Sequence, residues 1–160
     1  MLREYDRLKR ANIPTLLVKH TIDTRSGTDV IKTHSGIECN ALQTHHLLDI
    51  NVDTLKKYDY ILIDEGQFFN DLFSFCWVNA NMENKIIIVA ALNSNFKGEL
   101  FGSITNLLGC AKIKFLTAIC KCGEAATMSK RLIKGDEKEI SIGGKEKYDA
   151  RCIHCFQQED

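Results

Sequence analysis

Short apolar runs alternate with amphipathic segments along this chain. Three apolar runs have the length and composition of buried strands, and they lie at 15–19, 60–63 and 85–92. A fourth strand is expected at about 111–118. Helical spacing of apolar residues predicts helices at 1–11, 52–57, from an N-cap at Asn70 to about 78, and at 103–108. This order of strands and helices predicts a parallel three-layer α/β domain.

Two adjacent carboxylates follow the strand predicted at 60–63. Open α/β sheets bind ligands at the carboxyl ends of their strands, where Asp64 and Glu65 are expected to lie. Because side chains alternate along a strand, one carboxylate can serve a hydrated Mg²⁺ and the other can take a proton from a hydroxyl. Phe68 and Phe69 follow, and large apolar groups beside charges favour a lined pocket. The alternative is a strand that ends in a solvated acidic turn.

Length and charge narrow the class of protein. A chain of 160 residues is usually one domain with at most a small appendage. Lys and Arg (21) balance Asp and Glu (21), so no overall basic field favours nucleic acid or a membrane surface. No apolar run approaches the ~20 residues of a membrane helix, and the charged N-terminus is unlike a signal peptide. We therefore expect a soluble, cytoplasmic protein.

Seven cysteines are unevenly distributed. Three are scattered and are expected to be buried or idle thiols: Cys39, Cys76 and Cys110. The other four form two close pairs, which suggest one structural Zn²⁺ in a chain without a secretory signal: Cys120, Cys122, Cys152 and Cys155. The first pair has one intervening residue instead of two, unligated thiols are the alternative, and His154 could replace one ligand. Because composition changes after Ala118, we expect domains at 1–118 and 119–160.

Several motifs occur in the order found in one known family. They are Asp23-Thr24-Arg25, Asp64-Glu65-Gly66-Gln67-Phe68-Phe69, Val89-Ala90-Ala91-Leu92, Leu116-Thr117-Ala118-Ile119-Cys120, Gly143-Gly144-Lys145-Glu146-Lys147-Tyr148 and the terminal Cys-x-x-Cys. With them the chain resembles the class II, cytosolic-type thymidine kinases over nearly its whole length. The resemblance implies a P-loop-NTPase-like α/β core, a zinc-held lobe with a lasso over the nucleoside, and a homotetramer. It also implies transfer of the ATP γ-phosphate to the thymidine 5′-hydroxyl in nucleotide salvage for DNA synthesis.

The resemblance also assigns roles to individual residues. Glu65 matches the general base and Asp64 the Mg²⁺-associated acid, while Asp23 and Arg25 fall near metal and phosphates. Phe68 and Phe96 match the aromatic walls of the thymine pocket, although Phe96 could instead be a core residue. The lasso contacts to the nucleoside match Ser129, Gly143 and Tyr148, and the zinc ligands match Cys120, Cys122, Cys152 and Cys155.

One family feature does not occur in these 160 residues. The family begins with a strand and a loop ending in Gly-Lys-Ser/Thr, whose amides and lysine cradle phosphates, and no such motif is present here. The sequence thus indicates either a truncated chain or a family member that has lost its ATP-binding loop. We expect no kinase activity from these 160 residues by themselves. A non-catalytic relative is one alternative. A zinc-ribbon nucleic-acid module is another, but from Ile119 onward six Lys and two Arg only balance eight Asp and Glu.

Overall fold

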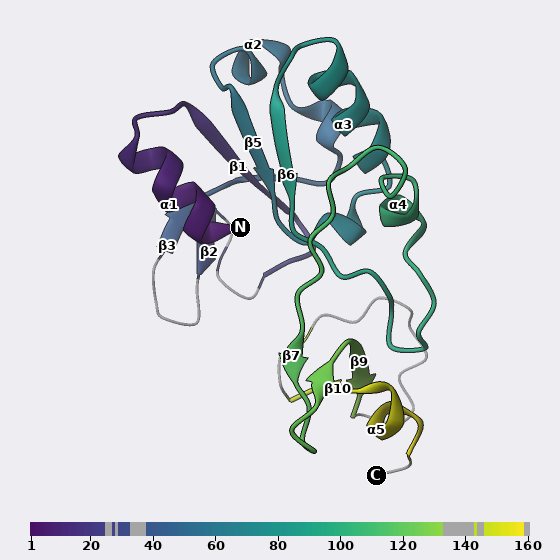
Figure 1. Cartoon of the computed structure of the whole chain (residues 1–160). Coiled ribbons are helices and arrows are strands. Elements are labelled where there is room, and N and C mark those ends of the chain that lie inside the picture. The colour runs from purple at the N-terminus through teal and green to yellow at the C-terminus, as the bar shows by residue number, and fades with distance from the viewer. Residues whose placement is uncertain (25–26, 28, 33–37, 133–142, 144–145, 159–160) are drawn as a thin grey trace. The chain divides into compact units, whose positions relative to one another are not determined.

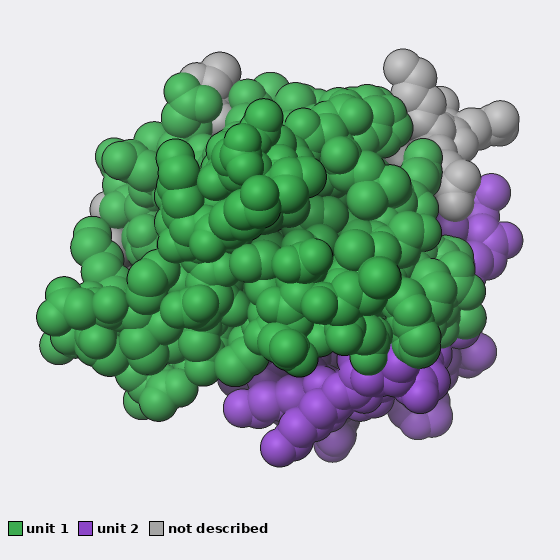
Figure 2. All heavy atoms as spheres, turned by 90° about the horizontal axis from the view of Figure 1, so that it is seen from above, with its two compact units in different colours: residues 1–92, 102–107 green, residues 93–101, 108–160 purple. Residues whose placement is uncertain are grey.

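The structure is a computed structural model, which describes residues 1–24, 27, 29–32, 38–132, 143 and 146–158. Its chain forms two compact units, coloured separately in Figure 2. The first unit contains Met1–Leu92 and Gly102–Leu107, and the second contains Asn93–Phe101 and Leu108–Asp160. The domain division expected at residues 118 and 119 stays a prediction.

The first unit contains most of the regular structure (Figure 1). Its helices are α1 Leu2–Arg10, α2 Val52–Leu55, α3 Leu72–Asn81 and α4 Gly102–Thr105, with short 3-10 turns at Leu47–Asp49 and Gly66–Phe68. Its strands are β1 Thr15–His20, β2 Val30–Lys32, β3 Glu38–Asn40, β4 Leu42–Thr44, β5 Tyr60–Ile63 and β6 Ile86–Val89.

Four of these strands form one parallel sheet in the order β4-β1-β5-β6, which confirms the predicted fold class. The register pairs Val18 of β1 with Ile63 of β5, and Ile63 with Val89 of β6. Strands β5 and β6 thus end together and β1 continues to His20, so the residues that follow the three strands lie at one edge of the sheet.

Apolar side chains cover both faces of this sheet, as the apolar strand sequences require. Alternate residues of β1 and β5 pack against α2 and α3 on one face, where the buried residues include Val18, Ile61 and Phe75. On the opposite face Leu17 and Leu62 pack with Leu8 of α1 and with residues of the β2–β3 hairpin. Burial on both faces fixes the position of the β5 carboxyl end.

Two details of the first part of the chain differ from the sequence-based expectations. The stretch before β5 contains β4, a short strand whose polar residues hid it from the pattern. Helix α3 begins at Leu72 with Asp71 as its N-cap, so the prediction of Asn70 was wrong. The Asp71 carboxylate does not cap the helix and instead accepts a hydrogen bond from the Leu48 amide at 2.9 Å.

The strand predicted at 111–118 was also wrong. Residues 112–117 have no strand structure, and only Ala118–Ile119 forms a strand, β7, which pairs with β8 Ala125–Ala126 in a hairpin. Phe115 and Leu116 are 72% and 79% exposed. An apolar sequence becomes a strand only beside a hydrogen-bonding partner, and none of the described strands pairs with this segment.

The second unit is poor in regular structure. It contains the β7–β8 hairpin, an antiparallel pair of β9 Met128–Arg131 with β10 Tyr148–Arg151, and the short helix α5 Ile153–Gln157. Its buried cluster consists of three cysteines and one alanine: Cys120, Ala126, Cys152 and Cys155. Across both units, none of the helices within the described ranges has the length and apolar character needed to cross a membrane.

Candidate functional site

The two sequence-predicted carboxylates lie at the carboxyl end of β5. Asp64 still belongs to the strand register, because its amide donates to the Val18 carbonyl at 2.9 Å, and its side chain is half-buried. Glu65, also half-buried, turns out of the strand with φ 51° and ψ 45°. This left-handed conformation is uncommon for residues other than glycine, and such residues cluster at functional sites.

A buried glutamine holds Glu65 in place. Gln67 Nε2 donates to Glu65 Oε2 at 2.6 Å, while Gln67 Oε1 accepts from the Leu92 amide at 3.0 Å. Ser103 Oγ donates to the Gln67 carbonyl at 3.3 Å. The hydrogen bonds to Leu92 and Ser103, which both follow β6 in sequence, hold Gln67 in place. The Gln67 side chain in turn orients the Glu65 carboxylate.

Gly66 makes this turn possible. Its amide donates to the Ala90 carbonyl at 2.9 Å, and a Cβ at this position would lie 2.5 Å from Val89 Cγ1. Any larger residue would push the turn away from β6, and with it the carboxylate that the turn presents.

A loop after β1 brings a third carboxylate to the same edge of the sheet. Asp23 is buried, and its amide donates to the His20 carbonyl at 3.0 Å. Lys19 precedes it with a completely buried side chain, whose Nζ donates to the carbonyls of Gly27 at 2.9 Å and Val30 at 3.1 Å. Lys19 therefore secures the loop that contains Asp23, whereas Arg25 lies outside the described residues.

Phe68 lies beside a group of aromatic and imidazole rings. Its ring centroid is 6.0 Å from that of His20, whose ring also contacts Phe69 at 4.7 Å and His45 at 4.9 Å. His20 is buried, and its Nδ1 accepts from the Ile22 amide at 3.0 Å. Burial, reinforced by neighbouring His45, lowers the pKa of His20.

Four cysteines come together in the second unit. Their sulfur atoms all lie within 4.8 Å of one another, although 30 residues separate Cys122 from Cys152. The sulfurs of these two residues are 3.7 Å apart. Four sulfurs bound about 2.3 Å from one Zn²⁺ lie about 3.8 Å from each other, so the cluster fits a tetrahedral zinc ion.

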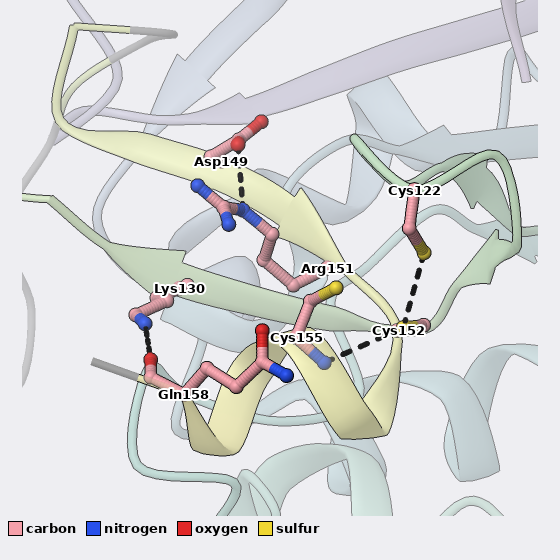
Figure 3. A network of polar contacts seen from close by, with 7 residues as sticks. All are labelled: Cys122, Lys130, Asp149, Arg151, Cys152, Cys155 and Gln158. Atoms are coloured by element: carbon pink, nitrogen blue, oxygen red, sulfur yellow. Dashed lines mark hydrogen bonds and ion pairs between the residues drawn. The ribbon is translucent and has the colours of Figure 1, made fainter. Parts of the chain in front are cut away.

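Each cysteine pair has its own local backbone structure, and Figure 3 shows Cys122 of the first pair and both cysteines of the second. Cys120 and Cys122 lie in the turn between β7 and β8, where the Gly123 amide donates to the Cys120 carbonyl at 2.9 Å and Gly123 adopts φ 92°. Cys152 is the N-cap of α5, and its sulfur accepts from the Cys155 amide at 3.5 Å. The single-residue spacing of the first pair therefore suits a hairpin turn and does not keep its sulfurs out of the cluster.

The backbone prepares one of these sulfurs to bind as a thiolate. Amide donation from Cys122, and then from Cys152, lowers the pKa of the Cys120 thiol to about 6. Crowding by the other thiols, Cys122 first, raises the pKa of Cys155 to about 12. Four thiols this close cannot all ionise without a cation among them, which agrees with the metal fit.

Two of the predicted nucleoside contacts of the second unit, Phe96 and Tyr148, lie against one arginine. In the antiparallel register, Tyr148 pairs with Arg131 and Ala150 with Ser129, so Ser129, Arg131 and Tyr148 share one face of the hairpin. Arg131 Cζ lies 3.6 Å from the centroid of Phe96, which precedes the hairpin by more than thirty residues. Gly143 lies against the side chain of Lys147.

Three of the residues that shape these sites escaped sequence reasoning: Lys19, Gln67 and Arg131. Gln67 was quoted only as part of a motif, and a lysine inside an apolar strand was the available signal for Lys19. No signal in the local sequence distinguishes Arg131 from an ordinary surface residue.

Known proteins resemble the chain over almost its full length. A protein-family model described as thymidine kinase matches residues 1–156. The thymidine kinase of Raccoon poxvirus is 40% identical over 162 aligned residues, which cover 99% of the chain and 89% of that protein. The thymidine kinase of Sheeppox virus (strain KS-1) is 41% identical over 158 residues (98% and 87%), and that of Vaccinia virus (strain Western Reserve) is 38% identical over 159 (98% and 87%).

A parallel α/β unit with acidic residues at its strand ends is followed in sequence by a lobe whose four cysteines could hold a metal ion. Together with these matches, this arrangement identifies the family: the chain belongs to the thymidine kinases.

Proposed function

We propose that the protein takes part in the ATP-dependent phosphorylation of the thymidine 5′-hydroxyl, with Glu65 as general base. The observation that supports this best is the Gln67 contact, which holds the Glu65 carboxylate at 2.6 Å on a turn with an unusual backbone conformation. A base must be positioned before its pKa matters, and a fixed carboxylate at a strand end meets that condition. The proton of the attacking hydroxyl would pass to Glu65.

We propose that Asp64 and Asp23 hold the Mg²⁺ that accompanies ATP, and that Arg25 contacts phosphates. Asp64 follows β5 and Asp23 follows β1, so both belong to the same edge of the sheet. Bound Mg²⁺ would neutralise phosphate charge, and it commonly uses one or two carboxylates together with water and phosphate oxygens. Lys19 then acts indirectly, by keeping the Asp23 loop on the sheet.

The nucleoside is proposed to contact Phe68 in the first unit and Phe96, Ser129, Gly143 and Tyr148 in the second. Aromatic faces suit a stacked pyrimidine, and hydroxyl groups with backbone amides suit its polar edge. Zn²⁺ held by Cys120, Cys122, Cys152 and Cys155 would be structural, because four sulfurs leave no open position for substrate. On the family resemblance we also propose a cytoplasmic homotetramer.

Calorimetric titration with thymidine tests the nucleoside part of this proposal. We expect saturable binding of thymidine, and much weaker binding of deoxyguanosine, whose larger base does not match a pyrimidine pocket. Substitution Phe68→Leu should weaken thymidine binding, while Phe73→Leu, on helix α3, serves as a matched control. Equal titration curves for the two nucleosides, or no heat with either, would overturn the thymidine assignment.

A further inference from the structure

Arg131 connects two parts of the second unit that are far apart in sequence. Its guanidinium carbon lies 3.6 Å from the ring centroid of Phe96 and 5.5 Å from that of Tyr148. Its terminal Nη2 also donates to the Tyr148 hydroxyl at 2.9 Å. One side chain thus contacts the loop that follows β6 and, across the hairpin, strand β10.

The loop that presents Phe96 is well ordered by its own hydrogen bonds. The Asn95 side chain accepts from the amides of Lys97 at 2.9 Å and Glu99 at 3.1 Å, and it donates to the Glu99 carboxylate at 2.9 Å. Gly98 closes the turn with φ 85°, at a point where a Cβ would lie 3.1 Å from Met128 Cε. The loop is therefore held by its own hydrogen bonds and approaches β9 at Met128, and Arg131 contacts both its aromatic ring and Tyr148.

We propose that Arg131 is a positioning residue for nucleoside binding, which keeps Phe96 and Tyr148 in one fixed arrangement. This role rests on the proposed function, in which both aromatic residues contact thymidine. The guanidinium covers one face of the half-buried Phe96 ring, and Lys97 Nζ lies 5.8 Å from the centroid of the same ring. We expect the base to use the part of the ring that the guanidinium does not cover. Without Arg131 the two rings must be brought together by the nucleoside itself, and that ordering weakens binding.

The chemistry at this position calls for arginine in particular. A planar guanidinium can stack on one ring while an N–H in its plane donates to a hydroxyl, and an ammonium cannot do both in one geometry. Lysine at position 131 would keep the charge but only one of the two contacts at a time. The positioning role therefore predicts that thymidine affinity falls stepwise when residue 131 is arginine, then lysine, then methionine.

Thymidine titration of matched variants tests the proposal. We expect Arg131→Met to weaken thymidine binding ~10-fold or more, Arg131→Lys to weaken it less, and Lys130→Met to leave it unchanged. Lys130 is the neighbouring residue of β9, and its ammonium donates to the Gln158 carbonyl instead. Tyr148→Phe removes the hydroxyl and should weaken binding much less in the Arg131→Met background than alone.

Amide hydrogen exchange without nucleoside provides the second measurement. Arg131→Met should speed exchange in 93–101 and 148–151 and leave β1 and β5, as well as zinc content, unchanged. Unchanged exchange and unchanged affinity in a chain that binds thymidine would overturn the role of Arg131 while leaving the proposed function intact. A chain of natural sequence that does not bind thymidine would instead overturn the proposed nucleoside site, and the positioning role with it.

Discussion

The two units of this protein are stabilised in different ways. The first buries leucine, isoleucine, valine and phenylalanine side chains on both faces of a parallel sheet. Among the described residues of the second unit, the buried apolar cluster consists of Cys120, Ala126, Cys152 and Cys155, and two of the strands are two residues long. Apolar burial contributes about 25 cal/mol per Å², so a cluster of four small side chains offsets little of the entropy of ordering a chain.

The two units therefore differ in what is expected to stabilise them and in which proposed site residues they contain. The sheet supplies the edge on which the proposed catalytic carboxylates lie, and apolar clusters cover both of its faces. The second unit supplies the proposed nucleoside contacts, and we expect its order to depend on the proposed zinc ion. A perturbation of either unit should therefore have consequences that the other does not share.

Loss of the metal should have the largest effect. We expect about one Zn²⁺ per chain, and simultaneous Cys152→Ser and Cys155→Ser substitution should abolish zinc binding and unfold the second unit, because structural zinc is worth ~10–16 kcal/mol. Elemental analysis and amide exchange measure both effects, with β1 and β5 expected to stay protected. Cys110→Ser, at an exposed thiol outside the cluster, is the matched control. A purified protein without zinc, or a double variant that keeps it, would contradict the prediction.

Removal of the proposed base should leave both units folded and stop the chemistry. In a chain fused to a segment with the Gly-x-x-x-x-Gly-Lys-Ser/Thr motif, Glu65→Gln should reduce turnover ~10²–10⁴-fold. Glutamine preserves shape and hydrogen-bonding reach but cannot accept the proton, so thymidine affinity should change little. Steady-state phosphorylation assays and thymidine titration together test this. Normal turnover in the variant would show that another group is the base.

A core cavity in the sheet unit should be independent of zinc. Leu62 is completely buried in β5, and Leu62→Ala should lower the free energy of unfolding of the first unit by ~2–5 kcal/mol. Urea unfolding followed by far-ultraviolet circular dichroism measures the change, and zinc content should stay the same. If zinc is lost together with the stability of the sheet, the two units are energetically coupled and the comparison made above fails.

The aromatic ring of Phe96 should matter for binding and not for folding. Phe96→Ala should weaken thymidine binding by ~1–3 kcal/mol, the value of an aromatic stacking platform, with zinc content unchanged. Phe101→Ala, in the same loop, is a suitable control. Thymidine affinity that does not change would mean that Phe96 is only a packing residue of the second unit.

The smallest expected effect is a pH dependence confined to the sheet unit. Because burial lowers the pKa of His20, the folded protein takes up its proton less readily than the unfolded chain, where histidine has a pKa of about 6.5. Stability should therefore fall as the pH drops below about 6.5. The neighbours His45, His46 and Asp71 modify this pKa. His20→Asn should reduce the difference in urea midpoint between pH 7.5 and 5.5, and an unchanged difference would exclude His20 as its source.

The sequence predicted the parts of the fold that depend on local pattern. Continuous apolar runs identified β1, β5 and β6, and close cysteine spacing identified the sulfur cluster, since both signals lie within a few residues. The segment 111–118 failed because an apolar run forms a strand only beside a partner, and partners are not encoded locally. Lys19, Gln67 and Arg131 were missed for the same reason, as each acts through contacts with distant parts of the chain.

The left-handed backbone of Glu65 places the proposed general base in a conformation that lowers the stability of the fold. An ordinary residue in that conformation costs about 1–2 kcal/mol, and glycine would avoid most of the cost. Directed evolution for heat resistance alone would therefore favour Glu65→Gly, which would raise thermal stability and remove the carboxylate. Selection for catalysis acts in the opposite direction, so a glutamate retained at this position during stability selection would indicate a chemical requirement.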